Sequence, residues 1–189
     1  GPAVALSNLG WTLDTAPVDE DGICSPEAIE SALQPETRLA SIMWANNETG
    51  TVQPIAELAQ VCRQRGVLFH TDAVQTVGKI PIDLSNSAID MLSLSGHKLH
   101  GPKGVGALYI RKGTKFSPFL IGGHQESGRR GGTENTAAIV GLGRAAEFVA
   151  AHMEEENTRV KSLRDRLESE LIRRVPDAVV NGDTDNRLP

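Results

Sequence analysis

The stretch LSLSGHKLHGPKGVGALYI, which runs from Leu92 to Ile110, decides the fold. Its start belongs to a short apolar run, Ile89–Leu94, and its end forms another, Val105–Ile110, so both ends are predicted as strands. Glycines around the start of the second run favour a hairpin-like return. Lys98 lies between the two runs, after the first strand and before a glycine-rich turn, so the sequence places an amine at the carboxyl end of a strand.

Strands and helices alternate on the N-terminal side of this stretch. The apolar runs Trp11–Val18, Leu39–Ala45 and Val67–His70 are predicted as strands. A short helix begins after Ser25, whose side chain can cap it, and an amphipathic helix spans Pro54–Arg65. This alternation predicts an α/β fold with a mainly parallel sheet and helices on both faces.

The C-terminal part is predicted to be helical almost throughout, over Glu134–Val175. Gly141 and Gly143 are weak points of this helix, and the charged run Glu154–Thr158 is a place where one helix can end and another begin. A short strand, Ala178–Val180, is predicted after the helix, followed by a turn.

The composition argues against several classes of protein. The chain has 189 residues and a formal net charge of -5, with no long basic run, which gives no electrostatic case for binding nucleic acid or an anionic membrane. No apolar run approaches the roughly 20 residues that span a bilayer, and the N-terminus does not read as a signal peptide. Cys24 and Cys62 belong to no metal-binding motif, so we expect free thiols, a reducing cytoplasmic location and no metal site.

Polar clusters follow three of the predicted strands: Asn46-Asn47, Asp72–Gln75 and Ser95–Lys98. In a parallel sheet, the carboxyl ends of the strands share one edge, and ligands bind there. We therefore expect these three clusters to lie close together.

Lys98 has the greatest chemical interest in these clusters. Most exposed lysines are solvated charges, but desolvation at a cramped strand end would free the amine lone pair for Schiff-base chemistry with pyridoxal phosphate. That cofactor needs a carboxylate near its pyridine nitrogen, and Asp72 is the candidate, although Asp72 can also be a helix cap. Candidate donors to the phenolic oxygen and the phosphate follow the same strands: Asn47, Gln75, Ser95 and His97.

The glycine-rich segment Gly122–Thr133 ends just before the predicted long helix. Backbone N–H groups at a helix N-terminus, with Arg129 and Arg130, can bind an anion. The same composition is typical of a flexible surface loop, so both interpretations of this segment stay open.

Several long stretches resemble the cysteine desulfurases of the class V aminotransferase group, in particular the NifS/IscS-like branch. They are MWANNETGTVQPI (Met43–Ile55), FHTDAVQTVGKIPIDL (Phe69–Leu84), MLSLSGHKLHGPKGVGALYIRKG (Met91–Gly113) and GGHQESGRRGGTENTAAIVGLG (Gly122–Gly143). They follow one another in the family's order and cover most of the chain between residues 40 and 145.

The resemblance implies the large domain of a fold-type I enzyme that uses pyridoxal 5'-phosphate. Residues 1–150 would form the cofactor-binding domain without its N-terminal part, and residues 151–189 the long linker helix and the start of a truncated small domain. The implied reaction converts L-cysteine to L-alanine and passes the sulfur, as a persulfide, to an iron–sulfur scaffold protein or another acceptor.

The resemblance also implies a role for each matching residue. Lys98 would be the catalytic lysine, and Thr133 would reach the phosphate of the neighbouring subunit's cofactor across a homodimer. The other implied cofactor-binding residues are Asn47, Asp72, Gln75, Ser95, Gly96 and His97. His70 lies near the implied site but receives no role.

The sequence departs from the family pattern in several places. The N-terminal phosphate loop, the histidine that stacks on the cofactor ring and the persulfide cysteine have no counterpart, so this chain alone is not expected to turn over cysteine. Ser127 stands where the family usually has arginine. The alternatives are another enzyme of this group, such as a selenocysteine lyase, or a non-catalytic module that binds a partner or dimerises through Gly122–Thr133.

Overall fold

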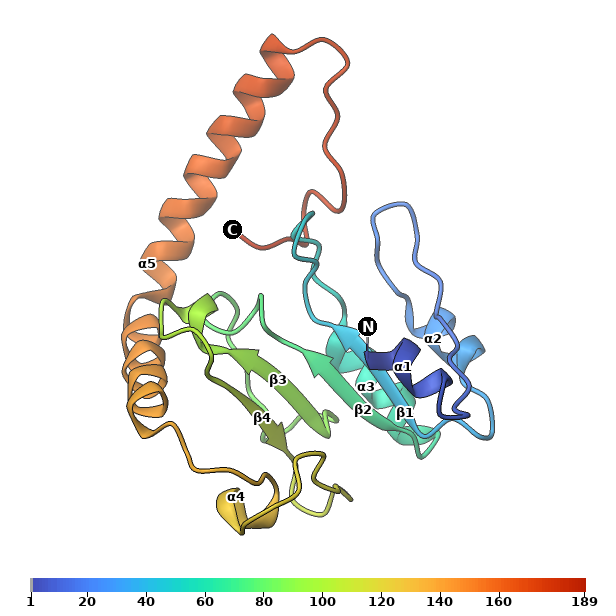
Figure 1. The fold of residues 1–189 in the computed structure, drawn as a ribbon. Coiled ribbons are helices and arrows are strands. Elements are labelled where there is room, and N and C mark those ends of the chain that lie inside the picture. The colour runs from blue at the N-terminus through green and yellow to red at the C-terminus, as the bar shows by residue number, and fades with distance from the viewer. Residues whose placement is uncertain (1) are drawn as a thin grey trace.

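The protein is described here by a computed structural model that covers residues 2–189, so Gly1, the first residue of the predicted cofactor-binding domain, lies outside it (Figure 1). A four-stranded sheet forms the centre, in the order β1 (Leu39–Met43), β2 (Leu68–Asp72), β3 (Met91–Ser95) and β4 (Gly106–Ile110). Strands β1, β2 and β3 are parallel, and β4 returns antiparallel to β3. The mainly parallel α/β fold and the hairpin-like return are confirmed.

Helices connect and flank the strands: α1 (Pro2–Ser7), α2 (Pro26–Ala32), α3 (Ile55–Gln64), the 3-10 helix η1 (Gly96–Leu99), α4 (Gln125–Gly128) and α5 (Thr136–Arg174). The Ser25 side chain caps α2, because its hydroxyl accepts a hydrogen bond from the Ala28 N–H. Helix α3 begins after Pro54 and stops before Gly66, whose φ of 69° ends the helix. None of the described helices combines the length and the apolar character that crossing a bilayer requires.

The hydrophobic core lies between the sheet and the two helices α2 and α3. Helix α3 packs against β2, and α2 packs against α3. Leu58 and Cys62 of α3 and Phe69 of β2 are fully buried there, and Cys24 is almost fully buried. The expectation that Cys24 and Cys62 are free thiols is confirmed, and both are buried.

The other side of the sheet, called the open face below, carries exposed side chains. Leu39, Ser41 and Met43 of β1 alternate with the inward residues Ala40 and Ile42, as expected for a strand with one buried face. Helix α1 contributes no buried residue. The helices that pack tightly, α2 and α3, lie on the other face.

Two predicted strands are wrong. Trp11–Val18 and Ala178–Val180 have no regular secondary structure, and Trp11 and Val179 are 57% and 77% exposed. An apolar run forms a strand only where a neighbouring strand satisfies its backbone N–H and C=O groups, and neither run has such a neighbour among the described residues.

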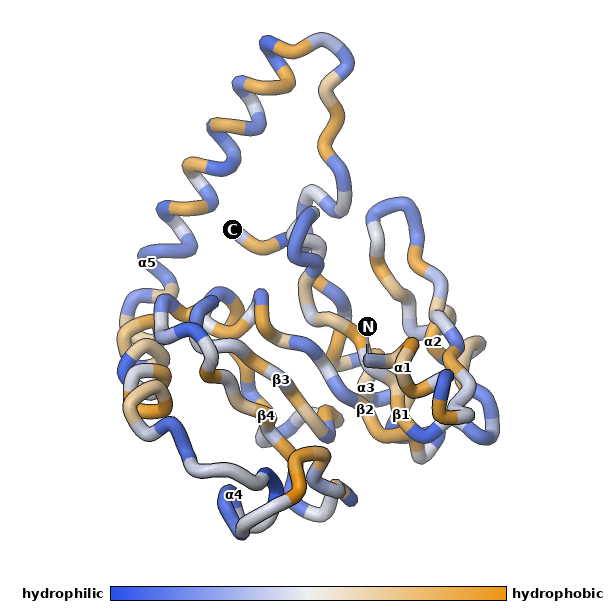
Figure 2. The backbone as a smooth tube through the Cα atoms, viewed as in Figure 1, coloured by the Kyte–Doolittle hydropathy of each residue, from blue (hydrophilic) through white to orange (hydrophobic). Residues whose placement is uncertain are grey.

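Helix α5 is unbroken, whereas the sequence allowed a break at Glu154–Thr158. The helix also crosses residues 150 and 151 without interruption, so the predicted domain boundary coincides with no end of secondary structure. Its outer half extends away from the sheet (Figure 1). Hydrophobic and hydrophilic residues alternate along that half (Figure 2), and Leu163, Leu167 and Leu171 are exposed on it.

After α5 the chain turns back and reaches the loop that follows β1 (Figure 1). We call Gly182–Leu188 the C-terminal clasp. The Val52 N–H donates to the Asn186 carbonyl at 2.8 Å, and the Leu188 N–H donates to the Gly50 carbonyl at 3.0 Å. The clasp thus supports the loop from the outside.

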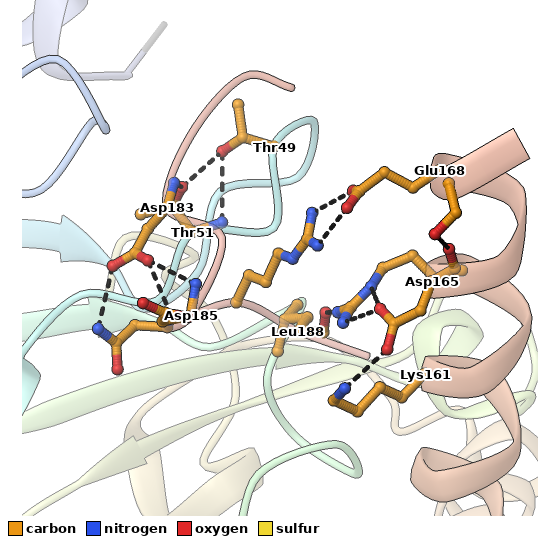
Figure 3. Close-up of polar contacts among 12 residues, drawn as sticks. Thr49, Thr51, Lys161, Asp165, Glu168, Asp183, Asp185 and Leu188 are labelled. Atoms are coloured by element: carbon orange, nitrogen blue, oxygen red, sulfur yellow. Dashed lines mark hydrogen bonds and ion pairs between the residues drawn. The ribbon is translucent and has the colours of Figure 1, made fainter. Parts of the chain in front are cut away.

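The clasp is also tied to α5. Arg187 donates two hydrogen bonds to the Glu168 carboxylate, at 2.6 and 2.9 Å (Figure 3). These hydrogen bonds lower the pKa of the Glu168 carboxyl. On the neighbouring turn, Asp165 accepts from Lys161 and Arg164, which lower its pKa to about 2. The outer half of α5 is therefore connected to the body of the molecule by charged side chains.

Candidate active site

The carboxyl ends of β1, β2 and β3 meet at one edge of the sheet. Asp72, the last residue of β2, pairs with Met43 of β1 and with Ser93 of β3. The backbone confirms this register, because the Trp44 N–H donates to the Asp72 carbonyl at 2.8 Å and the Ala73 N–H donates to the Ser93 carbonyl at 3.0 Å. The three polar clusters predicted at strand ends are thus brought to the same edge.

Asp72 lies on the open face and is exposed. Its Oδ1 accepts a hydrogen bond from the Val74 N–H at 2.9 Å, which orients the carboxylate. Among the described residues, no hydrogen bond uses Oδ2. A tight turn follows, in which the Thr76 N–H donates to the Ala73 carbonyl and which places Gln75, half-buried, beside the strand end.

Asn47 lies at the exposed tip of the loop after β1. Its neighbour Asn46 shapes this loop, because Oδ1 accepts hydrogen bonds from the Glu48 and Thr49 N–H groups at 2.8 and 3.0 Å. With the clasp on its outer side, the loop keeps a defined conformation.

The segment Ser95–Lys98 forms the start of η1, directly after β3. The Ser95 hydroxyl and the His97 Nδ1 are hydrogen-bonded at 2.8 Å. Gly96 is buried against Val105, and a Cβ atom at this position would lie 2.8 Å from the Val105 Cγ1. Only glycine fits here without movement of the β3–β4 connection, which explains why a glycine separates Ser95 from His97.

The side chain of Lys98 lines a cavity of about 480 Å3 between η1 and α5. Phe148 and Met153 of α5 line the apolar part of this cavity, and Lys79 is a second amine in it. Asp72 is not one of the described residues that line it, so the structure brings Lys98 and Asp72 to one edge but not into one pocket.

Two residues near this edge, Lys79 and His70, receive no role from the sequence. Burial and the nearby charge of Lys98 lower the pKa of Lys79. His70 of β2 accepts or donates a 2.8 Å hydrogen bond with the Ser41 hydroxyl of β1. The sequence contains a signal for Lys79, a charged residue directly after Gly78 in a turn that follows a strand, whereas the contact of His70 depends on strand register.

The glycine-rich segment Gly122–Thr133 lies at the opposite end of the sheet from η1 (Figure 1). It follows β4, which runs antiparallel and carries the chain away from the edge of Lys98. Thr133 is exposed, and Asn135, rather than Thr133, caps α5 by accepting from the Ala138 N–H. Within one chain, Thr133 is therefore not brought near Lys98. Ser127 lies in this segment with a φ of 59°.

Fold and site together define an α/β protein with an amine and a carboxylate at the carboxyl edge of its sheet. The sequence profile of the family described as aminotransferase class-V matches residues 2–189, so the chain belongs to this family.

Relatives and solved structures agree with this assignment. The chain is 61% identical to a cysteine desulfurase of Gluconacetobacter diazotrophicus over 91% of its length, and 58% identical to the cysteine desulfurase NifS of Azotobacter vinelandii over 97%. It spans 43% and 46% of those two proteins. A solved NifS-like protein superposes with a TM-score of 0.93 at 40% identity, over 98% of this chain and 51% of that one.

Proposed function

We propose that this chain is the cofactor-binding core of a pyridoxal 5'-phosphate-dependent cysteine desulfurase. The reaction would convert L-cysteine to L-alanine and transfer the sulfur to an iron–sulfur scaffold protein or another acceptor. Family membership and the names of the relatives support the reaction class. The observation that carries the proposal is the register of β2 and β3, which sets Asp72 beside Ser93, three residues before Gly96 and the η1 segment with Lys98.

The residues at this edge suit such a cofactor by their chemistry. When bound, pyridoxal phosphate supplies an electron-accepting ring that stabilises negative charge at the substrate carbon. Asp72, whose Oδ2 is not used by another described residue, would hold a proton on the pyridine nitrogen. Lys98 would bind the aldehyde carbon through Nζ, since its side chain lines the cavity beside η1, directly after β3.

The other predicted residues would bind and orient. Asn47 and Gln75 would donate to the phenolic oxygen, and Ser95, Gly96 and His97 would bind the phosphate at the start of η1. The hydrogen bond between Ser95 and His97 supports this assignment, because it orients two polar side chains together directly after the strand.

A homodimer is part of the proposal. The segment Gly122–Thr133 and η1 lie at opposite ends of the sheet in one chain (Figure 1), so a phosphate contact by Thr133 would be made with a second copy. In the dimer, Thr133 of one subunit would approach the Ser95–His97 segment of the other.

Lysine labelling tests the central assignment. The protein is mixed with pyridoxal phosphate, reduced with borohydride and digested, and the modified lysine is located by mass spectrometry. We expect modification at Lys98 and its loss in Lys98→Ala, with no loss in Lys103→Ala, an exposed lysine of the same connection. Modification spread over surface lysines, or undiminished in Lys98→Ala, would refute the assignment. Assays of alanine release from cysteine and from selenocysteine by the intact parent protein then separate a desulfurase from a selenocysteine lyase.

A further inference from the structure

His70 lies in the centre of the open face, two residues before Asp72 on β2. In the sheet register it pairs with Ser41 of β1 and with Met91 of β3. The Ser41 hydroxyl is 2.8 Å from the His70 Nδ1, so a cross-strand hydrogen bond fixes the ring. The ring is half-buried, between the exposed Ser41 and the half-buried Met91.

Asp72 is the charged neighbour of this imidazole. Side chains two residues apart on a strand lie on the same face, so His70 and Asp72 both belong to the open face. The register partners of His70, Ser41 and Met91, carry no charge. Burial lowers the pKa of His70, and the Asp72 carboxylate partly opposes this shift. The imidazole is therefore neutral at neutral pH, and its charge state responds to Asp72.

We propose that His70, anchored by Ser41, is a positioning residue that keeps the Asp72 carboxylate available to a cationic ring nitrogen. The inference rests on the proposed function, because it assumes that Asp72 pairs with the pyridinium of pyridoxal phosphate. A neutral imidazole leaves the negative charge of Asp72 uncompensated, whereas a protonated one would compete with the cofactor for it.

The sign of the linkage follows from this competition. A protonated His70 attracts Asp72 in the free protein and repels the pyridinium in the complex, so cofactor binding releases the proton. Affinity for the cofactor should then fall as the pH drops through the pKa of His70. A residue that cannot titrate at this position should remove that dependence.

NMR titration of the cofactor-free protein tests the coupling directly. We expect the pKa of His70, followed through its ring C–H signals, to fall in Asp72→Asn, because the carboxylate that raises it is gone. Asp83→Asn is the matched control, since Asp83 also accepts the N–H of the residue two positions on, Ser85, but lies in another loop. Equal His70 pKa values in the wild type and Asp72→Asn would overturn the proposal.

Cofactor titration then tests the consequence. We expect His70→Lys, a permanent cation, to weaken pyridoxal phosphate binding by about tenfold, the equivalent of one pKa unit of coupling. His70→Gln should keep the affinity at pH 7.5 and lose the decrease on the acid side. Circular dichroism confirms that each variant is folded, and wild-type affinity in folded His70→Lys would overturn the proposal. A wild type that does not bind the cofactor would refute the proposed function, while the NMR result still decides whether His70 and Asp72 are coupled.

Discussion

Burial acts on two titratable residues of neighbouring elements with opposite signs. It lowers the pKa of His70, because the charged form of histidine is the protonated one, and it raises the pKa of Cys62 to about 11, because the charged form of cysteine is the thiolate. The nearby charge of Asp90 adds to the shift of Cys62. Both residues are thus held in their neutral forms near neutral pH.

The raised pKa of Cys62 predicts that its thiol reacts slowly while the chain is folded. At pH 8 we expect an aromatic disulfide reagent to modify Cys62 about 100-fold more slowly in the folded than in the urea-unfolded chain, since two pKa units reduce the thiolate fraction by that factor. Burial also raises the pKa of Cys24, so we expect Cys24 to be modified slowly in the folded chain as well. Fast labelling of Cys62 in the native protein would contradict the packing described here.

The same residue makes stability depend on alkaline pH. The pKa of Cys62 is about 11 in the folded chain, against an ordinary value of 9.0. The contribution of the neutral Cys62 thiol to the free energy of unfolding is therefore fully present below pH 9 and is lost as the pH rises to about 11. Urea midpoints measured over this range should fall in the wild type and fall less in Cys62→Ala. Parallel curves for the two proteins would exclude the contribution.

For single residues, the sequence predicted which ones lie at the ends of strands. Lys98 and Asp72 were visible in this way. The environment of His70 was not, because its partner Ser41 is 29 residues away and is brought to it only by the register of β1 against β2. The roles assigned to the site residues stay predictions.

At the scale of elements, the capped helix α2, the amphipathic helix α3 and the buried strand β2 were predicted correctly. The run Trp11–Val18 failed because an apolar pattern does not reveal whether a partner strand exists. The break that the sequence allowed at Glu154–Thr158 does not occur, for a local reason. Arg159 pairs with Glu156 one turn away, and this pair supports the helix within the charged run.

The two glycines of α5 are predicted to differ. A Cβ at Gly143 would meet nothing within 4 Å, so Gly143→Ala should stabilise the protein by up to about 1 kcal/mol through helix propensity. A Cβ at Gly141 would lie 2.6 Å from the Pro102 Cγ, so Gly141→Ala should push α5 away from the segment after η1 and destabilise by about 1–3 kcal/mol. Thermal unfolding checks both variants, and equal effects would show that α5 does not pack tightly on Pro102.

At the scale of the whole molecule, the sheet with α2 and α3 is a packed unit, while the outer half of α5 is joined to it through the clasp (Figure 3). The sequence predicted the long helix but not the clasp. Contacts such as that between Asp183 and Thr51 join residues 132 positions apart, and no local pattern encodes them. Stability should therefore differ between these two parts of the chain.

Hydrogen exchange in Gly182→Ala tests this difference. A Cβ at Gly182 would lie 2.5 Å from the Thr51 Oγ1, so we expect the clasp to loosen and amides of the outer half of α5 to exchange at least several-fold faster, with β2 unchanged. Gly22→Ala is the control, because Gly22 has the same φ of 80° but no atom near its Cβ position. Equal exchange in both variants would mean that the clasp does not support the helix.

The alternation of side chains along β2 has one more consequence. Phe69 and Thr71 point into the core, while His70 and Asp72 belong to the open face. Deleting one residue at the start of this strand would exchange the two sets, so that a phenyl ring faced outward and an aspartate entered the hydrophobic interior. Deleting two would restore the original sides. Insertions and deletions that keep both faces intact should therefore change the length of this strand by an even number of residues.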